Sequence, residues 1–158
     1  MNPERTALKT ELLHRIREQV QAQLMALSTM ISASRDEATS DQSRPENKYD
    51  TRALEASYLA AGQGERLAAL KQLSGWLQIV PNEPKGVVAP GCFIELEDGQ
   101  WLLLAPQGGH EVQCGSRTVR LISAASPLGR VIRGAEPGDV CDYETPAGQR
   151  ELEVLGVL

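Results

Sequence analysis

Cysteine and histidine are the residues of this chain best suited to metal binding or covalent catalysis, and their spacing argues against both. The three cysteines, Cys92, Cys114 and Cys141, have no CxxC spacing and are odd in number, so we expect buried or half-buried free thiols rather than a zinc site or a disulfide framework. His14 and His110 neighbour no nucleophile motif, which argues against a catalytic triad.

Glycine-rich and acidic segments are the other candidates for chemistry. Gly108 and Gly109 lack the pattern of a phosphate-binding loop and predict a turn instead. Acidic side chains gather in and directly after the polar segment 35–45, which contains turn-forming residues and a helix-stopping proline. They are Asp36, Glu37, Asp41 and Glu46. Such charges can simply solvate a turn, so their meaning depends on the elements that carry them.

A helical hairpin is predicted to present this acidic segment. Residues 2–34 are helix formers, and their apolar side chains recur at steps of three and four along a narrow seam: Leu13, Ile16, Val20, Leu24, Leu27 and Ile31. A narrow seam favours one partner helix, and residues 47–79 supply it with Ala53, Ala56, Ala60, Leu67, Leu70, Leu73 and Leu77. The alanines would allow close approach of the two helices, whereas Gly62 and Gly64 weaken the second helix midway.

Proline marks the end of this hairpin. Pro81 and Pro84 cannot continue a helix, so we predict a helical hairpin over residues 1–80 and a separate domain over residues 86–158. The second domain contains six short β-like runs, at residues 92–96, 101–105, 111–114, 119–123, 140–145 and 151–157.

Turn and cap residues organise these runs. Asp98 and Gly99 predict a two-residue hairpin, and residues 146–148 predict a second turn. One helix begins with Ser126 as its cap and Pro127 at its first position, and Gly134 can close it. The predicted fold class is α+β, with an antiparallel coiled-coil hairpin followed by a small antiparallel sheet and one short helix.

The charge distribution points to a protein partner. The net charge is −5, and residues 81–158 carry six basic against eleven acidic side chains, so no basic stripe is present to neutralise phosphates. The charges Glu4, Arg5 and Lys9 stand where a signal peptide would need an apolar run, and no stretch reaches about 18 apolar residues. We therefore expect a cytoplasmic monomer that binds neither membranes nor specific nucleic-acid sequences.

The order of elements and two stretches together resemble the Gre-type transcript cleavage factor superfamily. The run from Ile122 to Val157 is similar to the C-terminal domain of Gre factors through Ser126, Pro127, Leu128, Gly129, Gly134, Gly138, Asp139, Val140, Pro146, Gly148, Glu151 and Val154. Residues 46–50 resemble the EN-x-x-Y stretch after the hairpin tip of Gre factors, with Tyr49 one residue early.

This resemblance implies an FKBP-like C-terminal domain and RNA polymerase as the partner. In the family the hairpin enters the secondary channel, and two acidic tip residues help to hold the second catalytic Mg²⁺ for cleavage of backtracked RNA, which fits the preference of Mg²⁺ for oxygen ligands. The acidic candidates are Asp36, Glu37, Asp41 and Glu46, with Asp41 and Glu46 as the pair that would share Mg²⁺ with the polymerase. The partner-binding candidates are Asn47, Tyr49, Asp50, Ser126, Pro127 and Leu128.

One departure from the family falls where the chemistry is decided. Gre factors place an aspartate three residues before the glutamate of the EN pair, and this chain has Ser43 there. The change favours a factor that competes for the channel over one that stimulates cleavage, and leaves open a coiled-coil interaction module that does not bind polymerase.

An enzyme with its own active site is not expected. A prolyl isomerase would need an aromatic-lined pocket, and the domain offers only Phe93, Trp101 and Tyr143, which its core also needs. Tyr58 falls beside the apolar seam, where we expect it to pack. No cofactor is predicted apart from Mg²⁺ shared with the polymerase.

Overall fold

The computed structural model of the chain describes residues 2–39 and 51–158, and the side chains of all of them except 37–39 and 51–53. The chain forms two compact units. One combines Met1–Arg17 with Leu77–Leu158, and the other is Glu18–Trp76. Residues from both ends of the chain thus share a unit, while the domain boundary predicted between residues 80 and 86 stays a prediction.

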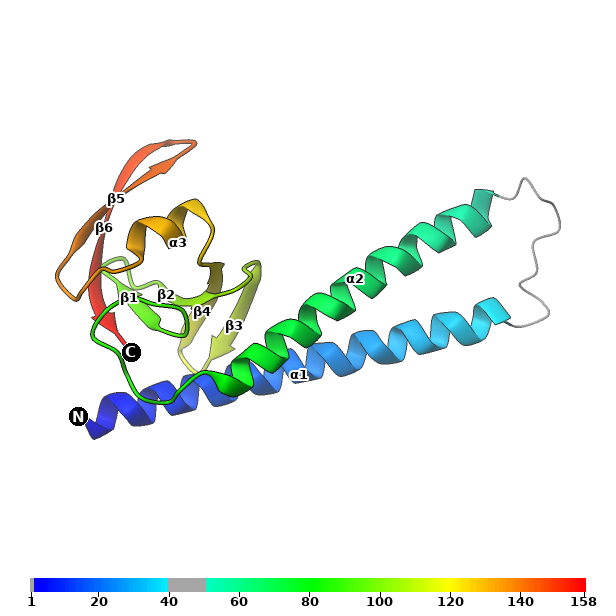
Figure 1. Cartoon of the computed structure of the whole chain (residues 1–158), viewed down its shortest axis with the longest axis horizontal. Helices are drawn as coiled ribbons and strands as arrows, with labels where there is room; N and C mark the ends of the chain where they lie inside the picture. The colour runs from blue at the N-terminus through cyan, green and yellow to red at the C-terminus, as the bar shows by residue number, and fades with distance from the viewer. Residues whose placement is uncertain (1, 40–50) are drawn as a thin grey trace. The chain divides into compact units, whose positions relative to one another are not determined.

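Two long helices make up the first half of the chain (Figure 1): α1 spans Pro3–Thr39 and α2 spans Thr51–Ile79. The predicted hairpin is confirmed. The turn predicted from residue 35 is wrong in its first five residues, because residues 35–39 contain no glycine or proline and continue α1. Helix α2 runs through Gly62 and Gly64 without interruption. In the part of the chain that the structure describes, no helix is long and apolar enough to cross a membrane.

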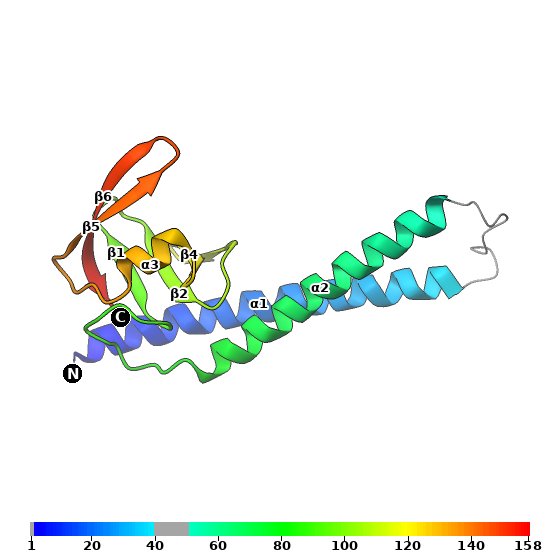
Figure 2. The ribbon, with the colours of Figure 1, turned by 45° about the horizontal axis from the view of Figure 1, so that its top comes forward.

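In the unit Glu18–Trp76, α1 and α2 pack along the predicted seam at one end only. Val20 and Leu27 on α1 are buried, as are Leu70 and Leu73 on α2. Figures 1 and 2 show the two helices separating toward the ends at residues 39 and 51. Ala56 and Ala60 are exposed, so the predicted close approach at the alanines is wrong. Alanine buries too little apolar area to hold two helices together without larger neighbours.

The other unit is built on a six-stranded sheet in the order β3-β4-β2-β1-β6-β5. Its strands are β1 Phe93–Leu96, β2 Trp101–Ala105, β3 His110–Cys114, β4 Arg117–Ser123, β5 Val140–Thr145 and β6 Gly148–Val157. All six predicted runs are strands. The expectation of an antiparallel sheet needs one correction, because β2 and β4 pair in parallel while the remaining pairs are antiparallel.

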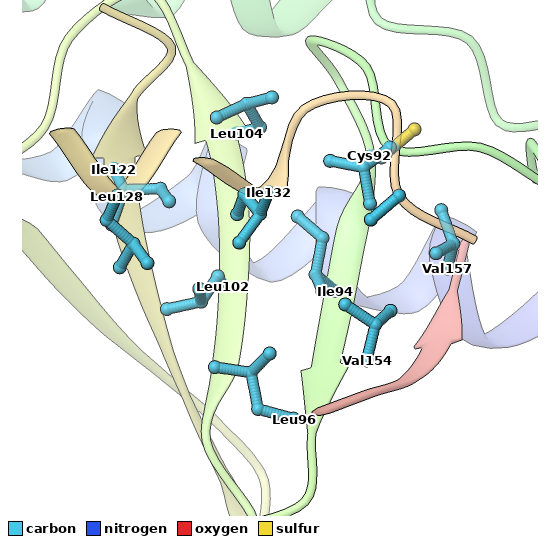
Figure 3. Close-up of a cluster of buried hydrophobic side chains, with 12 residues drawn as sticks. Cys92, Ile94, Leu96, Leu102, Leu104, Ile122, Leu128, Ile132, Val154 and Val157 are labelled. Atoms are coloured by element: carbon cyan, nitrogen blue, oxygen red, sulfur yellow. The ribbon is translucent and has the colours of Figure 1, made fainter. Parts of the chain in front are cut away.

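One face of the sheet is covered by α3, which spans Pro127–Ile132. Figure 3 shows the apolar core between this face and α3, with the side chains of Ile94, Leu102 and Leu104 beneath Leu128 and Ile132. All five side chains are buried. Burial of an aliphatic side chain contributes about 1.5–3 kcal/mol, so this core holds α3 against the strands.

The opposite face of the sheet is also buried. Strands β2 and β4 pair Leu103 with Leu121, and β1 pairs Phe93 with Leu103, so these three buried side chains share that face. The first turns of α1 belong to the same compact unit and contribute the buried Leu12 and Ile16. We expected the apolar seam of α1 to pack against a partner helix only. That expectation is therefore wrong for the first 17 residues of the chain. Their apolar stripe is broader than the seam because it includes Leu12.

Basic side chains tie the first turns of α1 to distant backbone carbonyls. The Lys9 ammonium is buried and donates to the Glu83 carbonyl at 2.9 Å, and Arg5 donates to the carbonyl of Val157. The Arg17 guanidinium donates to the carbonyls of Leu77 at 2.9 Å and Val80 at 3.2 Å. Burial lowers the pKa of Lys9 below its usual value. These bonds join residues that are at least sixty positions apart.

The β1–β2 turn differs in detail from its prediction. The Gly99 amide donates to the Leu96 carbonyl at 3.0 Å, and the Leu96 amide donates to the Gln100 carbonyl at 3.0 Å. The loop therefore has three residues, with Gly99 at φ +81°. Glycine takes this conformation without strain and forms the bulge that often follows a type I turn.

Candidate functional site

Two of the predicted acidic residues of the hairpin lie in the last turn of α1. Asp36 is exposed on the last turn of α1, and Glu37 follows it in the same helix. Asp41, Glu46, Asn47, Tyr49 and Asp50 lie outside the described residues. The acidic pair and its Mg²⁺ therefore stay predictions.

The second group of predicted residues forms the start of α3. The Ser126 hydroxyl accepts from the Gly129 amide at 3.0 Å and donates to the Ser123 carbonyl at 2.6 Å, so it caps the helix as predicted. Pro127 is exposed at the first turn, whereas Leu128 is only 7% exposed and belongs to the core. Pro127 is thus the member of this trio whose side chain is presented to solvent.

Gly129 fits this corner because a larger residue would collide with the chain. A Cβ atom at this position would lie 2.2 Å from the Ser123 carbonyl oxygen and 3.0 Å from the Ala124 Cα. Contacts under 3.0 Å to backbone atoms force the backbone to move. The Ser-Pro-Leu-Gly sequence therefore builds a tight corner between β4 and α3 and presents Pro127 at its edge.

A cavity of about 660 Å³ opens beside this corner. It is lined by residues of the loop before β3, of β3, β4 and β5, and of the start of α3: Gly108, Gly109, His110, Glu111, Arg120, Leu121, Ile122, Ser123, Ser126, Pro127, Leu128 and Tyr143. Apolar side chains and a few polar groups share the lining, as in sites that bind protein segments or small molecules. The cavity adjoins the predicted partner-binding residues Ser126, Pro127 and Leu128.

Sequence reasoning missed most of this cavity. Gly108 and Gly109 were predicted only as a turn, but a Cβ atom on Gly108 would lie 3.0 Å from the Ser123 amide nitrogen. The loop before β3 therefore passes close to β4 and forms one wall. Two successive glycines before a strand are the signal for such a close approach. Tyr143 comes from β5, and no local pattern links that strand to α3.

The cysteines show no sign of catalytic activation. Cys92 and Cys114 are buried and Cys141 is half-buried, and all three are free thiols, as predicted. Burial raises the pKa of the Cys114 thiol, and burial together with Asp139 and Asp142 raises the pKa of the Cys141 thiol. Within residues 2–39 and 51–158, no three potential ligands among His, Cys, Asp and Glu gather into a metal site.

Tyr58 lies on α2 in the half near the acidic segment, and its placement corrects our expectation. We expected it to pack beside the seam, but 71% of its surface is exposed. The reason is that Tyr58 stands two residues before Ala60 of the predicted seam, about 200° around α2, and so lies away from the seam.

A family model matches the second half of this chain. Residues 83–158 match the family model described as "Transcription elongation factor, GreA/GreB, C-term". This range includes the whole sheet, α3 and the cavity. The second half of the chain thus matches the GreA/GreB C-terminal domain, and the resemblance found in the sequence is confirmed. The description of the matching family names a transcription elongation factor.

Individual relatives are similar to the chain over a longer range of residues. The chain is 28% identical over 149 residues to the transcription inhibitor protein Gfh1 of Thermus thermophilus, covering 92% of this chain and 87% of that protein. It is 29% identical over 113 residues to Gfh1 of Thermus aquaticus, covering 69% and 71%. The crystal structure of GreA factor homolog 1 (Gfh1) of Thermus thermophilus aligns with 24% identity and a TM-score of 0.36, covering 90% of this chain and 94% of that one.

Proposed function

We propose that this protein is an RNA polymerase-binding regulator whose helical hairpin enters the secondary channel while the C-terminal domain rests at the channel mouth. The observation that carries the proposal is the presence in one chain of a GreA/GreB C-terminal domain and a preceding helical hairpin. The acidic balance of residues 81–158 supports a protein partner over nucleic acid, because it leaves little positive charge to neutralise phosphates.

The proposed activity is occupation of the channel, which restrains transcription or competes with other channel-binding factors. Ser43 replaces the aspartate that Gre factors carry before the EN pair, so one carboxylate of the family arrangement is missing. The similarity to a protein named as a transcription inhibitor supports the same direction. Asp41 and Glu46 remain the residues that would share Mg²⁺ with the polymerase if the protein stimulates cleavage.

The corner at α3 is the proposed docking point of the C-terminal domain. Pro127 is exposed beside the 660 Å³ cavity, and the rigid cap formed by Ser126 fixes its position. A fixed apolar side chain loses little conformational entropy on binding, which suits it to an interface.

The test combines a polymerase-binding assay with an RNA cleavage assay on a halted, backtracked elongation complex. The wild-type protein is compared with an Asp41→Ala, Glu46→Ala double variant. A matched control replaces two exposed acidic residues away from the tip, Glu65→Ala on α2 and Glu97→Ala in the β1–β2 turn, which removes the same charge.

We expect the wild-type protein to bind and to add no cleavage over the intrinsic rate. A Gre-like cleavage mechanism would be shown instead if the wild type stimulates cleavage, the tip variant does not, and the control variant still does. Absence of any binding would exclude polymerase as the partner and favour the coiled-coil interaction module.

A further inference from the structure

An exposed apolar pair lies on α2 in the half near its start. Leu54 is 57% exposed and Tyr58 is 71% exposed, and they are four residues apart on one face of the helix. Side chains at this spacing are neighbours on a helix surface. The pair therefore forms a continuous apolar spot rather than two separate exposed residues.

This spot is distinct from the hairpin seam. The seam on this helix passes through Ala56 and Ala60, and Leu54 and Tyr58 each stand two residues before one of them, about 200° around the helix. Closing the two helices on each other would bury the alanines and leave the pair in solvent. Its exposure is therefore not a consequence of the separation of α1 and α2.

The charges around the pair argue against nucleic acid as its ligand. Residues 54–64 carry a single charged side chain, Glu55, which is negative and exposed. Base stacking on tyrosine in nucleic-acid sites is accompanied by basic groups that neutralise the phosphates. The residues beside Tyr58 provide no such group, so an uncharged protein surface is the better match.

The size of the spot argues against a stable dimer of this chain. An aromatic side chain buries about 150–250 Å², whereas a stable interface takes about 800 Å² from each partner. The next residues on the same face, Ala61 and Glu65, are small or charged and add little apolar area. The pair is therefore large enough for only one part of a larger interface. Other surfaces of the same molecule would supply the remaining buried area.

We infer that Leu54 and Tyr58 anchor the helical hairpin of α1 and α2, here called the arm, by packing against an apolar protein surface of RNA polymerase. This inference rests on the proposed function, which supplies the remainder of the interface. Tyrosine is enriched among residues that dominate binding energy, because it buries a large rigid ring and keeps a hydroxyl for hydrogen bonding. The anchor would hold the arm by its outer face and leave the seam and the acidic segment free.

The experiment measures the affinity of the full-length protein for RNA polymerase with Tyr58→Ala, Leu54→Ala and the double variant. Ile79→Ala is the matched control, since Ile79 lies on the same helix and is 76% exposed. Alanine is the best helix former, so these changes do not weaken α2, and circular dichroism verifies its helicity. Sedimentation and RNA binding are measured on the same samples.

We expect the Tyr58→Ala variant to bind at least about tenfold more weakly, and Ile79→Ala to bind like the wild type. Equal affinity of wild type and Tyr58→Ala, or equal losses in Tyr58→Ala and Ile79→Ala, would overturn the anchor while the proposed function stands. No polymerase binding by the wild type would remove the proposed function itself. If the wild type forms a dimer or binds RNA and the Tyr58→Ala variant does not, the pair binds a second copy of the chain or RNA instead, and the inference is overturned.

Discussion

At the residue scale, Gly129 is the position where the least change should have the largest effect. A methyl group there would meet the Ser123 carbonyl oxygen at 2.2 Å, so Gly129→Ala has to displace either β4 or α3. Overpacking against fixed backbone costs about 1–3 kcal/mol. We expect the free energy of unfolding to fall by about that amount, measured by urea denaturation.

The control for this prediction is Gly86→Ala in the same compact unit. A methyl group on Gly86 would have no other atom within 4 Å, and its φ is not positive, so alanine should be tolerated. Similar losses in both variants would mean that the corner at α3 is not tightly packed. The same pair of variants also tests polymerase binding, because a shifted corner moves Pro127.

At the scale of the element, the helix stability of α2 is lower than its length suggests. Gly62 and Gly64 lie in the helix with nothing within 4 Å of a Cβ atom, so each lowers helix stability without a packing role. Gly62→Ala and Gly64→Ala should each stabilise the arm by about 1 kcal/mol. Amide hydrogen exchange along α2 would measure this as slower exchange near both positions.

Ala60→Gly provides the reverse control on the same helix, since Ala60 is exposed and should lose a similar amount when replaced. Unchanged exchange in the two glycine variants would show that packing rather than helix propensity limits the stability of the arm.

The strands and α3 were predictable because their signals act over a few positions. All six strands and the short helix follow from alternating apolar residues and from turn and cap residues such as Gly99 and Ser126. The parallel pairing of β2 with β4 was not predictable in this way, because β3 intervenes in the chain and lies at the edge of the sheet. Pairing between strands is a long-range property, and no local pattern encodes it.

The same limit explains the candidate site. Ser126 was predictable as a cap because its partner Gly129 is three residues away. Tyr143 was not predictable as a cavity residue, since strand order brings it to α3. The exposure of Tyr58 was missed because we placed it beside the seam, whereas the helix period puts it about 200° around α2 from Ala60.

At the scale of the whole molecule, the C-terminal sheet should depend on the first turns of α1. A fragment of residues 77–158 alone lacks Leu12 and Ile16, which belong to the same compact unit as the sheet. We expect it to unfold at a lower temperature than the full chain and to bind an apolar dye through the uncovered face. Joining residues 1–17 to residues 77–158 by a short Gly-Ser linker should restore cooperative unfolding, measured by calorimetry.

The linker is feasible because the Arg17 guanidinium reaches the Leu77 carbonyl at 2.9 Å, so the two backbones lie within about the length of one arginine side chain. A Leu12→Asp, Ile16→Asp form of the linked protein serves as the control, and it should behave like residues 77–158 alone. A fragment of residues 77–158 that is as stable as the linked protein would show that the sheet does not need α1.

The contact between Arg17 and the carbonyls of Leu77 and Val80 also bears on the order of folding events. Closing a flexible loop of about sixty residues costs roughly 3–4 kcal/mol of chain entropy. We expect the pairing of α1 with α2 to close that loop before the sheet assembles. In that order of events, the helical hairpin brings the first seventeen residues close to residue 77. It thereby shortens the conformational search by which they pack against the C-terminal sheet.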